Sequence, residues 1–200
     1  KNDPKLDVNQ TIQQETVMIF QRISSLFTCA ALAVASLAII LPAAVSAGPV
    51  VVMETTKGEI RINLADNVAP NHAKRIATLA DQGFYDNVVF HRVIEGFMAQ
   101  TGDPTGTGAG GSDLPDLKAE FSNVPFTRGM VGMARSRNPN SANSQFFIMF
   151  GDAPHLNGQY TIVGEVISGM DVVDSLKKGA RNQNGTVSNP DSIIKMRVGG

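Results

Sequence analysis

Short segments of alternating apolar and polar residues follow one another along most of the chain, and Gly, Pro, Asn or Asp bounds most of them. Alternation with a period of two is typical of strands with one buried face, and the bounding residues are those that form turns. The pattern predicts strands over residues 50–55, 59–64, 97–100, 130–134, 146–150, 161–166 and 193–198. Most of the chain after residue 48 is therefore expected to be β-structure.

Two segments have helical periodicity instead. Residues 71–82 carry apolar side chains at helical spacing, with Pro70 near the start and Gly83 just beyond the end. Residues 170–178 repeat this pattern and precede Gly179. Many short strands and two helices predict a mainly β fold, a closed antiparallel barrel with a helix over each open end.

The N-terminal quarter of the chain has a different character. Residues 1–17 are polar and precede Met18, and we interpret them as an upstream extension. Residues 18–47 have the basic start, apolar core and small-residue end of a secretory signal peptide, with cleavage expected after Ala47. An uncleaved anchor is the alternative, because apolar residues 23–41 would nearly cross a bilayer core of about 30 Å. Residues 48–200 then form the folded domain.

Charge, cysteine and histidine content narrow the chemistry. The formal net charge of −1 provides no electrostatic reason to expect nucleic acid or an anionic membrane as a partner. The only cysteine, Cys29, lies in the apolar core of the signal, so the mature protein has no thiol for a disulfide. His72, His91 and His155 lack the spacing of a helical zinc pair, so we expect no metal site.

A glycine-rich segment at residues 106–111, GTGAGG, formally matches the G-x-G-x-x-G dinucleotide fingerprint. That fingerprint requires a helix directly after the glycines, with its N-terminus facing a phosphate. Pro115 follows too soon for such a helix. We therefore interpret the segment as a flexible loop and not as a phosphate site.

Residues 90–104, FHRVIEGFMAQTGDP, set an arginine beside large apolar and hydrogen-bonding residues. If residues 97–100 form a strand, Met98 and Gln100 face one way while Phe97 and Ala99 face the other. A fixed cation, an apolar floor and an amide group then lie close together. This combination suits a substrate with an apolar ring and a neutral polar bond.

Residues 141–150, SANSQFFIMF, repeat this combination, with Gln145 and Phe147 on one strand face and Phe146 on the other, in the core. With GMVGMA at residues 129–134 and LNGQYTIVG at 156–164, these motifs resemble the cyclophilins, which are peptidyl-prolyl cis-trans isomerases. The resemblance covers about residues 50–198. It implies an eight-stranded antiparallel barrel capped by two helices, and isomerase activity on X-Pro bonds without a cofactor.

The resemblance also implies roles for individual residues. Arg92 corresponds to the family's catalytic arginine, and Gln100 to its polar partner. The implied substrate-binding residues are Phe97, Met98, Ala134, Arg135, Gln145, Phe147, His155, Leu156 and Tyr160. His155 stands where many members carry a tryptophan associated with tight cyclosporin binding, so we expect weak inhibition by that drug. Tyr160 stands where many members carry a histidine.

The expected partners are unfolded or flexible polypeptides that contain proline. We expect a monomer that binds neither nucleic acid nor, after cleavage of the signal, a membrane. The signal places the protein among exported proteins, in the bacterial periplasm or anchored in the inner membrane facing it. A non-catalytic chaperone module of the same fold, which only binds proline peptides, is the alternative function, and the presence of Arg92 favours the enzyme.

Overall fold

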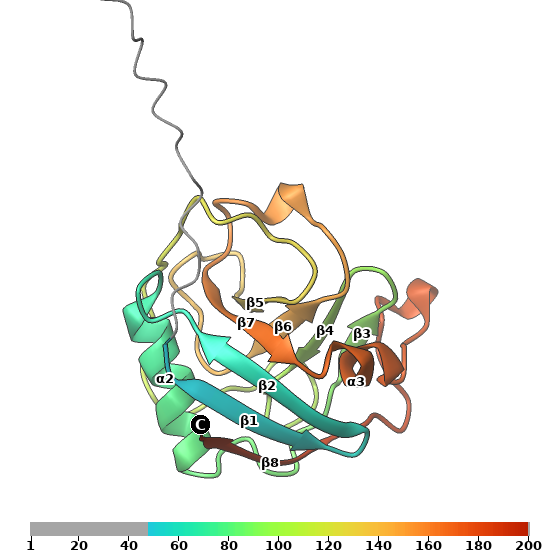
Figure 1. Ribbon diagram of the computed structural model, residues 1–200. Coiled ribbons are helices and arrows are strands. Elements are labelled where there is room, and N and C mark those ends of the chain that lie inside the picture. Colours follow the sequence, from blue (N-terminus) through green and yellow to red (C-terminus); the bar gives the residue numbers. More distant parts are fainter. Residues whose placement is uncertain (1–47, 200) are drawn as a thin grey trace, which may run out of the picture. The chain divides into compact units, whose positions relative to one another are not determined.

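A computed structural model describes residues 48–199 (Figure 1). The segments interpreted as an upstream extension and as a signal peptide or anchor lie outside the described residues. The strands are β1 (Val50–Thr55), β2 (Gly58–Leu64), β3 (Arg92–Ile94), β4 (Met98–Thr101), β5 (Met130–Met133), β6 (Phe146–Met149), β7 (Ile162–Ser168) and β8 (Ile193–Val198). The α-helices are α2 (Pro70–Asp81) and α3 (Met170–Ser175), and the 3₁₀ helices are η1 (Pro154–Leu156) and η2 (Arg181–Gln183).

The strands form one antiparallel sheet of eight strands in the order β3-β4-β6-β5-β7-β2-β1-β8. Its two edge strands, β3 and β8, are joined through the irregular backbone that precedes each of them. Phe90 N–H donates to Asp191 O at 2.9 Å, and Ile193 N–H donates to Val88 O at 2.8 Å. The sheet therefore curls into a barrel wall, and the predicted fold class is confirmed for the described residues.

The two helices lie on opposite sides of the strands, α2 against β8 and α3 against β2 (Figure 1). Helix α2 begins at Pro70, where a missing backbone N–H costs no hydrogen bond, and buries Ile76 and Leu79 in the core. Helix α3 ends at Ser175, before the predicted end at residue 178. The cause is Leu176, which turns to φ −58° and ψ 139° and buries its side chain.

All seven predicted strands are present, with small differences at their ends. The one strand that the sequence did not predict is β3, which has only three residues, too few for alternation to be recognised. It matters because it carries Arg92 beside Gln100, its partner in register on β4. No helix within residues 48–199 has both the length and the apolar character that a membrane span requires.

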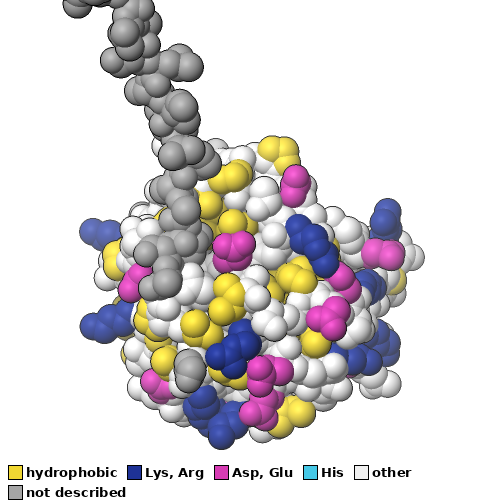
Figure 2. Space-filling model, in the orientation of Figure 1, with side chains coloured by type: hydrophobic (Ala, Val, Ile, Leu, Met, Phe, Trp, Pro, Cys, Tyr) yellow, Lys and Arg dark blue, Asp and Glu magenta, His cyan; other side chains and the backbone are white. Residues whose placement is uncertain are grey.

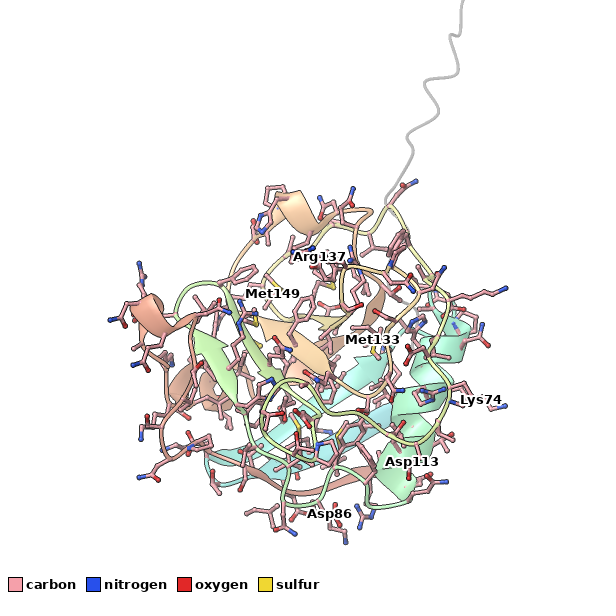
Figure 3. All side chains as sticks on the ribbon, turned by 180° about the vertical axis from the view of Figure 1, so that it is seen from behind. Lys74, Asp86, Asp113, Met133, Arg137 and Met149 are labelled. Atoms are coloured by element: carbon pink, nitrogen blue, oxygen red, sulfur yellow. The ribbon has the colours of Figure 1, made fainter. Side chains whose placement is uncertain are left out.

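Strands β4, β5 and β6 are apolar on both faces. In β6, Phe146 and Ile148 belong to the core cluster inside the barrel, whereas Phe147 and Met149 belong to a second cluster on its outer side. Figure 3 labels one methionine of each kind, Met133 in the inner cluster and Met149 in the outer one. The outer cluster is what the candidate site is built on.

The glycine-rich loop is organised around one buried carboxylate, that of Asp103, which has no exposed surface. Its Oδ1 accepts hydrogen bonds from the N–H and hydroxyl of Thr105, at 2.7 and 2.8 Å. Its Oδ2 accepts from the N–H groups of Thr107, Gly108 and Gly110, at 3.1, 2.6 and 3.1 Å. The sequence suggested that this loop would be flexible. The side chain of Asp103, just before it, instead holds its backbone in place.

These bonds change the acidity of Asp103. Burial raises its pKa, but the hydrogen bonds from Thr105, Gly110 and Gly108 outweigh burial and lower the pKa from 3.8 to about 2. A carboxyl whose pKa is lower in the folded state stabilises the fold above its unfolded pKa. That stabilisation is lost as the pH falls from about 4 toward 2.

We expect Asp103→Asn to lower the free energy of unfolding at neutral pH by about 2 kcal/mol, the equivalent of this pKa difference. The loss should shrink as the pH falls toward 2, where Asp103 of the wild type becomes protonated. Urea unfolding of both proteins across this pH range measures it. Asp113→Asn, at an exposed aspartate of the following segment (Figure 3), is the matched control and should leave stability unchanged. Equal losses in the two variants would contradict the role of Asp103.

Candidate functional site

A pocket with a volume of about 320 Å³ opens on the outer face of the sheet, over β3, β4 and β6. Ten of the eleven residues that the sequence predicted for the site line it: Arg92, Phe97, Met98, Gln100, Ala134, Arg135, Phe147, His155, Leu156 and Tyr160. The eleventh, Gln145, is hydrogen-bonded to Gln100 and lies in an adjoining pocket. The structure therefore brings the predicted residues together, and their individual roles stay predictions.

The Arg92 guanidinium is held from two sides. On the strand side, Nη1 donates to Gln100 Oε1 at 3.1 Å. On the opposite side, Nε donates to the main-chain oxygen of Asn184 and Nη2 donates to Asn184 Oδ1, both at 3.0 Å. Burial lowers the pKa of Arg92 below its ordinary value, and the nearby Tyr160 acts in the opposite direction. Arginine titrates so far above neutrality that the group stays charged.

A chain of amide groups connects Arg92 with the glycine-rich loop. Gln100 Nε2 donates to Gln145 Oε1 at 2.9 Å. Gln145 Nε2 in turn donates to the main-chain oxygens of Gly108 and Gly110, at 3.1 and 2.8 Å. Gln100 therefore has a fixed orientation, with its oxygen toward the arginine and its nitrogen toward Gln145.

The floor of the pocket is the ring of Phe147. It stacks on Phe126, with ring centroids 5.9 Å apart, and meets Tyr160 edge-on at the same separation. Gly132 is its partner in register on β5. A Cβ atom on Gly132 would lie 2.4 Å from Cζ of Phe147, so only glycine lets the ring lie flat across the strand.

The predicted orientation of Phe97 was wrong. Strand β4 begins at Met98, and Phe97 belongs to the turn before it, with its N–H donating to Ile94 O at 3.0 Å. The strand alternation therefore does not apply to Phe97. Its ring reaches the same pocket as Met98 and packs against His155, with centroids 5.7 Å apart and planes inclined by 31°.

Arg135 forms the boundary with the adjoining pocket, whose volume is about 490 Å³. Its Cζ lies 4.3 Å from the centre of the Tyr160 ring, and its Nε and Nη2 donate to Gln159 O at 3.2 and 2.8 Å. The two pockets share Gln100, Ala134 and Arg135. An extended peptide could therefore occupy both.

Sequence reasoning missed Asn184 and the inner support of the pocket by Phe126 and Met149. The dipeptide Asn184-Gly185 marks a turn, but no local signal connects that turn with an arginine 92 residues away. In residues 48–199, no group of histidine, cysteine, aspartate or glutamate side chains could hold a metal ion. On the face in Figure 2, acidic and basic side chains are intermingled.

Comparison with known proteins identifies the family and the fold. The model of the family "Cyclophilin type peptidyl-prolyl cis-trans isomerase/CLD" matches residues 50–198. A probable peptidyl-prolyl cis-trans isomerase of Brucella suis is 55% identical over 159 residues, 74% of this chain and 81% of that protein. A peptidyl-prolyl cis-trans isomerase-like 1 protein of Neurospora crassa is 41% identical over 152 residues, 74% of this chain and 93% of that protein.

Solved structures agree. The cyclophilin AquaCyp293 from Hirschia baltica matches with a TM-score of 0.68 and 29% identity, over 77% of this chain and 75% of that one. A Cryptosporidium parvum cyclophilin, crystallised in the presence of the dipeptide Ala-Pro, matches with a TM-score of 0.69 and 30% identity, over 76% of this chain and 99% of that one. The chain belongs to the cyclophilin family, and it is a cyclophilin-type peptidyl-prolyl cis-trans isomerase.

Proposed function

We propose that this isomerase acts on X-Pro bonds of exported polypeptides as they fold, and that Arg92 is its catalytic residue. The observation that carries the proposal is the position of the Arg92 guanidinium, held by hydrogen bonds at the rim of an apolar pocket. The export of its clients is inferred from the signal-like pattern of residues 18–47.

The reaction requires no bond to be broken. The nitrogen lone pair of a peptide bond is delocalised into the carbonyl, which produces a rotational barrier of roughly 18–20 kcal/mol. Isomerisation before proline is therefore slow enough to limit folding. A donor that binds the nitrogen lone pair as the bond twists favours rotation, and the rigid fork of a guanidinium is suited to this role.

Each part of the site then has a role. The proline ring is held in the pocket by Phe97, Met98, Phe147 and Leu156. The peptide backbone lies along Ala134, Arg135 and Gln145. Gln100 keeps one N–H of Arg92 engaged and so orients the rest of the fork. One preorganised donor in such a site is worth about 3–4 kcal/mol. The rest of the lowering of the rotational barrier comes from holding the peptide in a twisted geometry.

We expect Arg92→Ala to lower kcat for a proline tetrapeptide by about 10²-fold, because one preorganised donor is removed. Arg92→Lys keeps the charge but loses the fork, so it should recover only a small part of the rate. A chelator should leave the rate of the wild type unchanged. A protease-coupled or NMR exchange assay on the purified proteins measures all three. Wild-type turnover in Arg92→Ala would exclude the arginine as the donor.

Export is tested separately. When the full chain is expressed in a Gram-negative bacterium, we expect the protein in the periplasmic fraction with an N-terminus at Gly48, as cleavage after Ala47 requires. Mass spectrometry of the purified protein locates that end. An intact N-terminal segment in the membrane fraction would support the uncleaved anchor instead, and an intact chain in the cytoplasm would contradict export.

The contact between His155 and Phe97 leads to a prediction about inhibition. A tryptophan in place of His155 would present a larger apolar face beside the Phe97 ring. We expect the wild type to bind cyclosporin weakly and His155→Trp to bind it about tenfold or more tightly, with similar kcat for a tetrapeptide. Titrating the drug in one isomerase assay compares the two proteins. Equal inhibition constants would show that this position does not control sensitivity.

A further inference from the structure

The segment between α3 and β8 runs along the edge of β3 that does not pair with β4. Gly179 N–H donates to Val93 O at 2.9 Å, and Val93 N–H donates to Gly185 O at 2.8 Å. Val187 N–H donates to His91 O at 3.1 Å. These bonds fix the segment to the residues on both sides of Arg92. The turn at residues 180–186 therefore has a defined position relative to the arginine.

The turn itself is tightly constrained. Gly185 N–H donates to Ala180 O at 3.0 Å, and Thr186 N–H donates to Gln183 O at 3.1 Å. Asn184 has φ 55°, the left-handed conformation that asparagine and glycine tolerate best. A Cβ atom on Gly185 would lie 2.4 Å from Cγ1 of Ile94, so the turn can approach β3 closely only with glycine there.

This geometry brings two oxygens of one residue to one edge of the Arg92 guanidinium. Nε donates to the main-chain oxygen of Asn184, and Nη2 donates to its Oδ1, each at 3.0 Å. Nε–H and an N–H of Nη2 point the same way in arginine, so a pair of acceptors fixes the plane of the group. On the strand side, the bond to Gln100 and a longer one to Met98 Sδ, at 4.0 Å, both come from Nη1, so they fix the plane of the group less well than a pair of donors on two nitrogens does.

We propose that Asn184 is a positioning residue for catalysis, which holds the plane of the Arg92 guanidinium so that its remaining N–H groups face the prolyl nitrogen. The inference rests on the proposed catalytic role of Arg92. Asparagine suits the position because it accepts the left-handed backbone and also supplies a neutral oxygen. Alanine accepts the left-handed backbone poorly and has no side-chain oxygen.

The chain offers matched variants for the test. Asn184→Gly keeps the left-handed backbone and the main-chain oxygen but removes Oδ1. Asn184→Asp keeps an acceptor oxygen at the same place. Asn189→Gly is the control, because Asn189 is also exposed and left-handed, with φ 50°, in the same connection to β8. Asn189 is not among the hydrogen-bond partners of Arg92.

We expect Asn184→Gly to lower kcat about tenfold, the scale of one hydrogen bond to a charged group, with little change in KM. Asn189→Gly should stay within about twofold of wild type, well below the loss of such a bond. Asn184→Asp should fall between wild type and Asn184→Gly, because it keeps the acceptor oxygen but places a negative charge beside the guanidinium. In the Arg92→Ala background, Asn184→Gly should cause no further loss, since the two residues act as one unit. Wild-type kcat in Asn184→Gly, or an equal loss in Asn189→Gly, would overturn the proposal.

An NMR measurement separates this inference from the role of Arg92 itself. In the wild type the Arg92 Nε–H resonance should exchange slowly with water, and in Asn184→Gly it should shift and exchange faster. An unchanged resonance would overturn the positioning role whatever the kinetics show. Full activity of Arg92→Ala would instead refute the catalytic role of the arginine and, with it, any catalytic effect of Asn184 exerted through Arg92.

Discussion

The site depends on strands that are buried on both faces. In most sheets of this kind one face meets the core and the other meets water, but β4, β5 and β6 have apolar side chains on each side. The outer side chains must therefore be covered, and the segments around Phe126 and Leu156 cross over them. The floor of the pocket is in this way part of a packed core, which keeps Phe147 in place.

The extent to which the sequence specified this arrangement varies from element to element. Strand β6 was predicted with its faces correctly assigned, because four consecutive buried residues keep the period of two. Phe97 was assigned to the wrong face, because nothing in GFMAQ marks where the turn ends and the strand begins. The end of α3 was predicted three residues late, since Leu176 is apolar enough to continue a helix yet is buried by an extended backbone instead.

Local sequence patterns also predict only part of the candidate site. The resemblance of local motifs brought together Arg92, Gln100 and the apolar pocket, all of which lie in or next to recognisable strands. Local sequence carries no sign that the carboxylate of Asp103 collects the N–H groups of a whole loop. It likewise carries no sign that Asn184 meets the arginine. The contact of Asn184 follows from how the chain closes its barrel, so only the assembled fold reveals it.

The groups that hold Arg92 are all neutral: the side-chain oxygen of Gln100, the thioether sulfur of Met98 and two oxygens of Asn184. None of the ion pairs found in residues 48–199 involves this arginine. A carboxylate partner would have cancelled much of its positive field in the pocket. It would also have tied the arrangement to a group that gains a proton in acid. With neutral partners instead, the guanidinium keeps its full charge, and the groups that orient it do not change with pH in acidic or alkaline surroundings.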